Sequence, residues 1–335
     1  MTGFALAVEL DGEGSHPAAW SRTSGQALDP RTLLRRVRAA ENAGFTLATF
    51  DDSILPPDTR RPGGRIDAVN RAAFVAAATS TIGLVPVIET SYAEPFHIAS
   101  QLASLDYASR GRAGWIATRV TDPSAGTTWG RDVPDVDREQ RDVIEVVRRL
   151  WDSWEDDAVI RDYTTGRFLD RDKLHYVDFT GDSFSVKGPA IVPRPPQGQP
   201  VVFGAEADSD EVDVVLGEKH GPAAVFVEID ITLDSAGATA GERRAELDNQ
   251  APNPPGRRRQ YTGPPQGLVE LLIELSRGSD GVRLFPAVID EDLPALARCV
   301  LPALFAAGVA HRPVPGSTLR GNLGLPRPAN RYAKV

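Results

Sequence analysis

The chain has 335 residues, of which 41% are hydrophobic and 25% are charged, proportions typical of a globular protein with a large core. Its net charge of −9 and the lack of a long basic run exclude a nucleic-acid backbone as an expected partner. A single cysteine, Cys299, excludes an internal disulfide framework and a cysteine-based zinc site.

Neither export nor membrane insertion is expected for this chain. No apolar run approaches the ~18 residues that a membrane-spanning helix needs. The opening segment, MTGFALAVEL, lacks the basic part and the long apolar part of a signal peptide. We therefore expect a cytoplasmic protein with no membrane partner.

Seven apolar runs are predicted to be strands of a parallel sheet. Each run is short, is bounded by turn-forming residues and is followed by a segment with helical spacing. In chain order these strands are 3–9, 45–50, 82–88, 113–117, 201–205, 223–229 and 281–288.

The helical segments alternate with the strands. The first begins at Asp29 and Pro30, a good N-cap and a good first-turn residue, and closes near Gly44. The others are 68–79, 94–108, 138–154, 210–219, 240–247, 267–276 and 293–306. The last of these carries Cys299, which is predicted to be a small buried residue.

This alternation predicts a (β/α)₈ barrel, with an eighth strand placed at 258–262. A doubly wound open sheet is the alternative, but no G-x-G-x-x-G follows the first strand and no P-loop is present. We expect one barrel domain over 1–312, an insertion at 121–198 between strands 4 and 5, and an irregular tail over 313–335.

Several sequence blocks are familiar when taken together and in order. They include Ala40–Phe45 (AENAGF), Glu94–His97 (EPFH), Gly111–Trp115 (GRAGW) and Leu150–Ala158 (LWDSWEDDA). With these blocks the chain resembles the bacterial-luciferase-like flavin monooxygenases, and specifically their nitrilotriacetate monooxygenase branch. The resemblance spans nearly the whole chain.

The resemblance implies a TIM-like barrel that binds reduced FMN at the C-terminal ends of its strands. It implies that a separate reductase supplies the flavin, and that oxygen is used to hydroxylate or cleave a small organic substrate. It also implies a homodimer, or a heterodimer with a paralogue. The family has a longer connection between strands 6 and 8, so we expect the strand 7 region to be shortened here.

The flavin contacts of the family fall on residues that are mostly substituted. An aspartate after strand 2 is kept as Asp52. The other family positions carry Val87, Ile116, Glu206, Ala207 and Asp208. Val87 and Ile116 cannot hydrogen-bond a flavin. Glu206 and Asp208 would bring negative charge to the phosphate, which needs donors, and like charges ~4 Å apart repel by ~4 kcal/mol near a protein surface.

Other residues at strand ends and in loops are expected to line a pocket. They are Trp20, Phe50, Asp51, Glu89 and Tyr92. The pair formed by Asp51 and Asp52 fits acid–base chemistry or, equally, turn and capping roles.

Two other patterns give negative predictions. The five histidines, His220 among them, show no metal-ligand spacing, so no metal site is expected. The run Arg257–Arg259 is interpreted as a solvated loop.

Two functions stay open on the sequence. The first is a reduced-FMN-dependent monooxygenase, which the whole-chain resemblance favours. The alternative is a catalytically silent luciferase-like subunit, or a binding protein, that has lost FMN binding and pairs with an active paralogue. The substituted flavin contacts favour this alternative.

Overall fold

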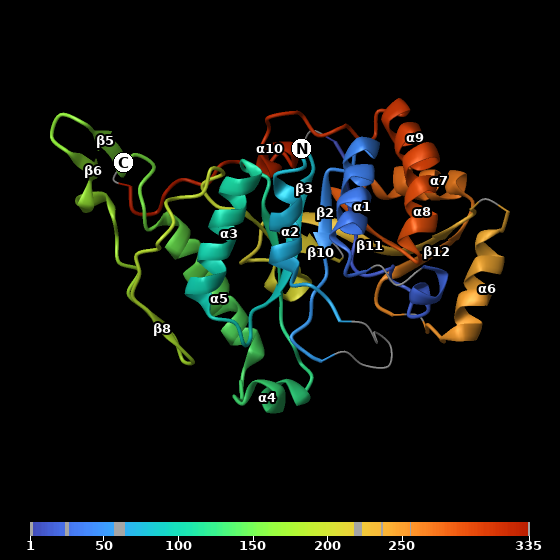
Figure 1. Cartoon of the computed structure of the whole chain (residues 1–335), viewed down its shortest axis with the longest axis horizontal. Coiled ribbons are helices and arrows are strands. Elements are labelled where there is room, and N and C mark those ends of the chain that lie inside the picture. The colour runs from blue at the N-terminus through green and yellow to red at the C-terminus, as the bar shows by residue number, and fades with distance from the viewer. Residues whose placement is uncertain are drawn as a thin grey trace.

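The computed structural model describes residues 3–23, 27–56, 64–217, 223–235, 237–254 and 256–333. Eight parallel strands form a closed barrel (Figure 1). Around the ring they are β1 (Ala5–Glu9), β2 (Leu47–Phe50), β3 (Gly83–Glu89), β4 (Gly114–Thr118), β9 (Val201–Ala205), β10 (Val214–Leu216), β11 (Ala224–Leu233) and β13 (Gly281–Pro286). Because β13 pairs with β1, the ring closes, and the predicted (β/α)₈ barrel is confirmed.

Helices pack on the outside of most of the ring (Figure 1). The helix α1 begins as predicted, since Asp29 accepts a hydrogen bond from the Arg31 N–H at 3.1 Å and Gly44 ends it with a φ of 100°. In chain order, the helices are α1 (Pro30–Ala43), α2 (Ala68–Ala76), α3 (Pro95–Ser109), α4 (Ser124–Trp129), α5 (Val136–Asp152), α6 (Ala240–Gln250), α7 (Pro265–Leu275), α8 (Ile289–Ala295) and α9 (Leu301–Ala306), and of these α4 lies apart from the helices around the ring.

The last predicted helix is divided. A π turn, Leu296–Val300, joins α8 to α9. Leu296, Val300 and Leu304 face the core, whereas Cys299 is exposed on the opposite side. The prediction that Cys299 is buried is therefore wrong.

The region around β10 also differs from the prediction. Residues 210–219 are predicted to be a helix, but they contain the three-residue strand β10, preceded by a single 3₁₀ turn at Glu206–Asp208. The β-branched residues Val212, Val214 and Val215 explain the strand, because they pack well on a pleated surface. No α-helix lies in the described residues between β9 and β11.

The shortened part of the barrel is therefore not at strand 7. The seventh strand of the ring is β11, which is 10 residues long and paired on both sides. The helix predicted at 210–219, before this strand, is absent from the described residues.

The strand β11 changes neighbour along its length. Its first residues, Ala224–Phe226, pair with β10, whereas Ile229–Leu233 pair with β12 (Arg259–Gly263). The strand predicted at 258–262 therefore exists, but it lies outside the closed ring as an addition to one edge of β11.

The long connection between β4 and β9 carries two small hairpins after α5. The first pairs β5 (Val159–Asp162) with β6 (Arg167–Leu169), and the second pairs β7 (Phe179–Thr180) with β8 (Ser185–Val186). They lie at one edge of the molecule, away from the barrel (Figure 1).

The N-terminal end of the barrel is closed by the short helix α10 (Leu319–Asn322). Its Leu319 is fully buried inside the ring beside Gly83 and Gly114, where a Cβ would come within 2.7 and 3.0 Å of the leucine methyls. Only glycine leaves this space at the starts of β3 and β4.

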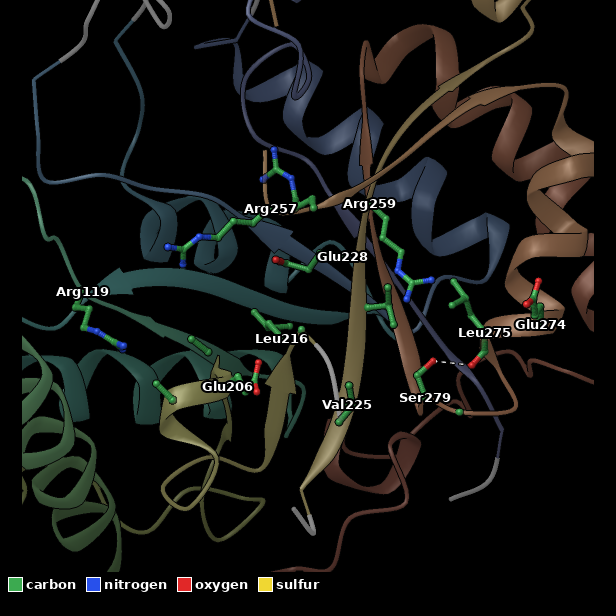
Figure 2. A pocket seen from close by; sticks show the side chains of 16 residues that line it. Arg119, Glu206, Leu216, Val225, Glu228, Arg257, Arg259, Glu274, Leu275 and Ser279 are labelled. Atoms are coloured by element: carbon green, nitrogen blue, oxygen red, sulfur yellow. Dashed lines mark hydrogen bonds between the residues drawn. The ribbon is translucent and has the colours of Figure 1, made fainter. Parts of the chain in front are cut away.

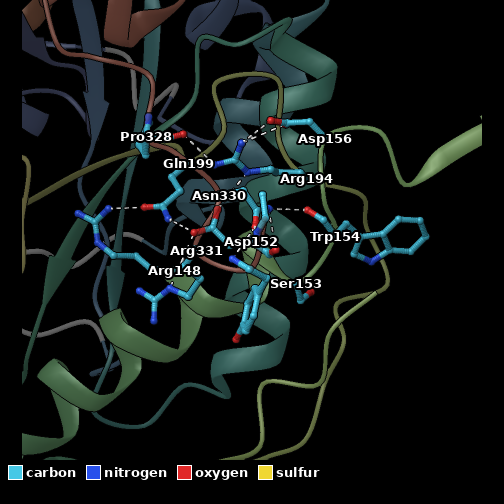
Figure 3. Close-up of polar contacts among 12 residues, drawn as sticks. Arg148, Asp152, Ser153, Trp154, Asp156, Arg194, Gln199, Pro328, Asn330 and Arg331 are labelled. Atoms are coloured by element: carbon cyan, nitrogen blue, oxygen red, sulfur yellow. Dashed lines mark hydrogen bonds and ion pairs between the residues drawn. The ribbon is translucent and has the colours of Figure 1, made fainter. Parts of the chain in front are cut away.

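The segment after α10 is fastened to α5 and to the neighbouring chain (Figure 3). Arg194 donates to the Asp152 carboxylate at 3.0 Å and to the Pro328 carbonyl at 2.8 Å. Asn330 donates to the carbonyls of Asp152 and Trp154, both at 2.9 Å. Ion pairs and backbone acceptors therefore fix this tail.

Candidate active site at the barrel mouth

The opening at the C-terminal ends of the strands, here called the mouth, holds a cavity of about 450 Å³. A second cavity of about 1160 Å³, here called the side cavity, adjoins it and runs along β11 (Figure 2). Six residues line both cavities: Arg119, Ala205, Leu216, Glu228, Arg257 and Arg258. The mouth cavity alone has the size of a small-molecule site.

The floor of the mouth cavity is apolar on one side. Val87 and Ile116 are both buried, are neighbours in the β3–β4 register and line the cavity. Leu216 and Phe285 line it from β10 and β13. Two positions at which the resemblance places flavin contacts are thus at the mouth, where they present methyl groups.

A buried arginine stands on the other side of the floor. Arg283 is 6% exposed and donates to Glu9 at 2.5 Å, to Glu228 at 2.8 Å and to Thr49 at 3.0 Å. Burial opposes its charged form, but the two glutamates outweigh burial and raise the pKa of Arg283. Its charge is therefore fully compensated by the protein.

The turn after β9 does not present its aspartate to the mouth. Asp208 is 1% exposed, and it accepts hydrogen bonds from Arg119 Nη1 at 3.0 Å and from Gln140 Nε2 at 3.0 Å. A second carboxylate, Asp137, pairs with Arg119 Nε. The repulsion of a phosphate expected from Asp208 is therefore reduced, because its carboxylate is buried and paired with Arg119, which Asp137 shares.

Glu206 and Ala207 lie where a ligand can reach them. Both are exposed and line the side cavity, and Figure 2 shows Glu206 among its lining residues. Of the three substituted positions in this turn, these two remain candidates for ligand contact.

In the run Arg257–Arg259, interpreted as a solvated loop, Arg257 and Arg259 are exposed as expected, but the run also lies beside the cavities. Arg257 and Arg258 line both cavities, and Arg259 lines the side cavity at the start of β12. Arg258 donates to Asp230 at 3.0 Å, and its Cζ lies 4.0 Å from the centre of the Phe285 ring. The pairing of β12 with β11 carries these arginines to the mouth.

The two aspartates after β2 have different surroundings. Asp52 accepts backbone N–H groups from Ser53 at 2.8 Å and Ala68 at 2.6 Å, so its side chain orders the start of α2. Asp51 lines the mouth cavity, and its backbone carbonyl accepts from Arg71. Asp52 thus fits the capping interpretation, and Asp51 faces the site.

Glu89 stands beside these aspartates at the end of β3, opposite Thr118 in the β3–β4 register. Burial raises its pKa to about 7; a hydrogen bond with Thr118 acts against this, and Asp51 and Asp52 add to it. Its Oε2 is buried without a hydrogen-bond partner in the described part of the chain. A carboxyl group near the mouth can thus change charge around neutral pH.

The predicted aromatic lining is not found around the two cavities. Phe50 is fully buried in the core between the ring and the helices, because successive strand residues face opposite sides. Tyr92 packs against Trp129 and Arg131, at 6.4 and 5.6 Å. Trp20 is 57% exposed. None of these three lines either cavity.

Neither a metal-binding cluster nor a membrane-spanning helix is found among the described residues. They contain no group of three or more His, Cys, Asp or Glu residues that could hold a metal ion. They also contain no helix long and apolar enough to cross a membrane. His220 lies outside these ranges.

Comparison with known proteins finds relatives along the whole chain. The family described as luciferase-like monooxygenase matches residues 11–214. The chain is 27% identical to N-acetyl-S-(2-succino)cysteine monooxygenase of Bacillus subtilis (strain 168), over 98% of both proteins. It is 33% identical to one of the two subunits of pristinamycin IIA synthase of Streptomyces pristinaespiralis, over 93% of this chain and 95% of that one.

Solved structures share the fold. EDTA monooxygenase from Chelativorans sp. BNC1 superposes with a TM-score of 0.83 at 22% identity, over 97% of this chain and 99% of that one. A long-chain alkane monooxygenase superposes with a TM-score of 0.81 at 18% identity, over 97% and 96%. At this identity the likeness establishes the barrel architecture.

Proposed function

Because the chain belongs to the luciferase-like monooxygenase family, we propose that it uses reduced FMN and oxygen to oxidise a small organic substrate at the barrel mouth. The mouth cavity carries this proposal, since it combines an apolar floor with arginines at its rim. Bound reduced flavin would supply the electrons and the activated oxygen for the oxidation. A separate flavin reductase is the proposed source of the cofactor.

The residues present fit a flavin in kind. Val87, Ile116 and Leu216 offer the flat apolar surface that a fused aromatic ring needs. The arginines around the rim suit an anionic tail, and Asp208, which would oppose it, is buried and paired with Arg119.

The chain's own part is to orient the reactants and to exclude water. The closed N-terminal end and the buried Leu319 leave the C-terminal side of the ring as the proposed entrance. The salt-bridged Arg283 is held on the floor by two glutamates. A polar group fixed in this way does not reorganise when a substrate binds beside it.

A second candidate is a silent subunit that pairs with an active paralogue. Val87 and Ile116 favour it, because neither side chain can hydrogen-bond a flavin. The relative from Streptomyces pristinaespiralis is itself named as one subunit of a synthase. In this case the barrel and a dimer surface would be kept while flavin turnover is lost.

The test is a titration of the purified protein with FMN, oxidised and then reduced under anaerobic conditions, followed by flavin fluorescence. Saturable binding contradicts the silent-subunit candidate. No binding of either form at about 1 mM contradicts the monooxygenase proposal for the isolated chain.

A conservative variant sharpens this test. Val87→Thr adds a hydroxyl at a position where the resemblance places a flavin contact, and it changes the side-chain volume little. If the flavin lies over Val87, one added hydrogen bond is expected to tighten binding about fivefold. Val85→Thr, one layer deeper on the same inner face of β3, is the control and should not tighten it.

A further inference from the structure

The charged side chain of Arg257 holds a particular position at the mouth. Arg257 lines both the mouth cavity and the side cavity, at the place where they join, and Figure 2 labels it beside Glu228. Its side chain is exposed. Any ligand that occupies both cavities must pass this guanidinium.

Three other arginines around the cavities have counter-ions, whereas Arg259, which lines only the side cavity, has no ion pair with a described residue. Arg119 is paired with Asp208 and Asp137, and Arg258 with Asp230. Arg283 is paired with Glu9 and Glu228.

Arg257 has no ion pair or hydrogen bond to any residue in the described part of the chain. Arg257 thus brings to the place where the cavities join a guanidinium that no described residue pairs with.

The backbone next to Arg257 is held in place. Arg258 is anchored by Asp230 and by the ring of Phe285. Arg259 begins β12 and is in register with Ile229 of β11. Because the two residues that follow it are fixed, Arg257 can bind a ligand at a smaller cost of ordering its loop.

We propose that Arg257 binds the anionic group of the ligand that occupies the mouth. This inference rests on the proposed function. A guanidinium forms paired hydrogen bonds with an oxyanion, so the group is a phosphate, as in FMN, or a carboxylate of the substrate. The segment before β12 then supplies a positively charged contact to the ligand. The turn after β9, which carries Glu206 and Ala207, cannot supply one.

The experiment compares FMN with riboflavin, which lacks the phosphate, in the wild type, Arg257→Ala and Arg171→Ala. Arg171 is an exposed arginine in the connection between β4 and β9, remote from both cavities, and serves as the control. If the anion is the phosphate, Arg257→Ala weakens FMN binding by about 10- to 100-fold and leaves riboflavin binding unchanged. Arg171→Ala should match the wild type for both.

A second arm covers the substrate. Succinate is titrated as a dicarboxylate probe onto the protein with riboflavin bound. If the anion belongs to the substrate, Arg257→Ala weakens succinate binding about tenfold or more, while FMN and riboflavin affinities keep the wild-type ratio.

The proposal is overturned if Arg257→Ala changes neither the preference for FMN nor the affinity for succinate. If the wild type binds no flavin, the proposed function fails separately. Arg257 is then tested with succinate and inorganic phosphate on the protein alone, and equal binding by wild type and variant contradicts the inference.

Discussion

The two ends of the barrel differ in how their polar groups are satisfied. At the N-terminal end Arg320 donates to the Gln199 carbonyl at 2.7 Å and to Asp213 at 2.8 Å, and Leu319 fills the ring. At the mouth Arg257 lacks a partner among the described residues, and one oxygen of Glu89 is buried without one. Stability is concentrated at the first end, and unused binding capacity at the second.

The largest expected effect is at the closed end. Arg320→Ala leaves the largely buried carboxylate of Asp213 with Arg148 as its one cationic partner among the described residues and with the Val202 N–H, and it removes the contact to Gln199. We expect a loss of about 3–5 kcal/mol in the free energy of unfolding, measured in urea. If the ends are independent, flavin affinity stays unchanged in the folded variant.

The control for this variant is an exposed arginine in the same tail. Arg327 pairs with Asp156, and both side chains are about half exposed, at 50% and 49%. Arg327→Ala should cost less than about 1 kcal/mol. Equal losses for the two variants would contradict the picture of a buried anchor at Arg320.

Leu319→Ala tests the apolar half of the same closure. The side chain is fully buried in the ring beside Gly83 and Gly114, and neither glycine can fill the space left by its removal. We expect destabilisation by about 3 kcal/mol. Unfolding in urea measures it, and a loss below about 1 kcal/mol would mean that the barrel end collapses around the gap.

At the mouth, Glu89→Gln is expected to raise the free energy of unfolding, whereas the variants at the closed end lower it. The pKa of Glu89 is raised from 4.5 to about 7, so between these values the native state holds a proton that the unfolded chain releases. Stability therefore falls as pH rises from about 4.5 to about 7 and is constant above. Glutamine stays neutral, so the variant should exceed the wild type by about 2 kcal/mol at pH 8, and by almost nothing at pH 4.5.

Urea unfolding of both proteins at pH 4.5, 6 and 8 measures this difference. Glu270→Gln, on the exposed side of α7, is the matched control and should leave the pH profile of the wild type unchanged. A difference between Glu89→Gln and wild type that does not grow with pH would show that Glu89 is not the group responsible.

The smallest expected effect concerns the anchor of the arginine segment. Arg258→Ala removes the ion pair with Asp230, which is partly exposed, and the contact with Phe285. We expect a loss of about 1 kcal/mol in unfolding free energy. We also expect FMN binding to weaken several-fold, because Arg257 would lose its fixed neighbour; equal FMN affinity would mean that Arg257 is positioned by β12 alone.

Local sequence patterns predict most of the ring and fail where pairing partners are distant. The β1, β3 and β13 runs are long and apolar, so their strands are predicted correctly. The strand β10 is three residues long, and its charged flanks fit a helix as well as a strand. Its valines Val212, Val214 and Val215 were the available signal for a strand.

Prediction of the site residues also depends on whether their partners are near or distant in the sequence. The resemblance places Val87 and Ile116 at the ends of strands 3 and 4, and both line the mouth cavity. The pairing of Asp208 with Arg119 joins residues 89 apart in sequence. The place of Arg257 depends on β12 adding to β11, which no local pattern around an arginine run reveals.

The leucine plug at the N-terminal end has a consequence for the order of events during synthesis. The first strand, β1, has its second pairing partner only when β13 has been made. The interior beside the starts of β3 and β4 is filled only when Leu319 has been made. A ribosome must therefore release nearly the whole chain before the barrel can complete its packing. Until then the starts of β3 and β4 expose an apolar hole, which chaperones are suited to cover.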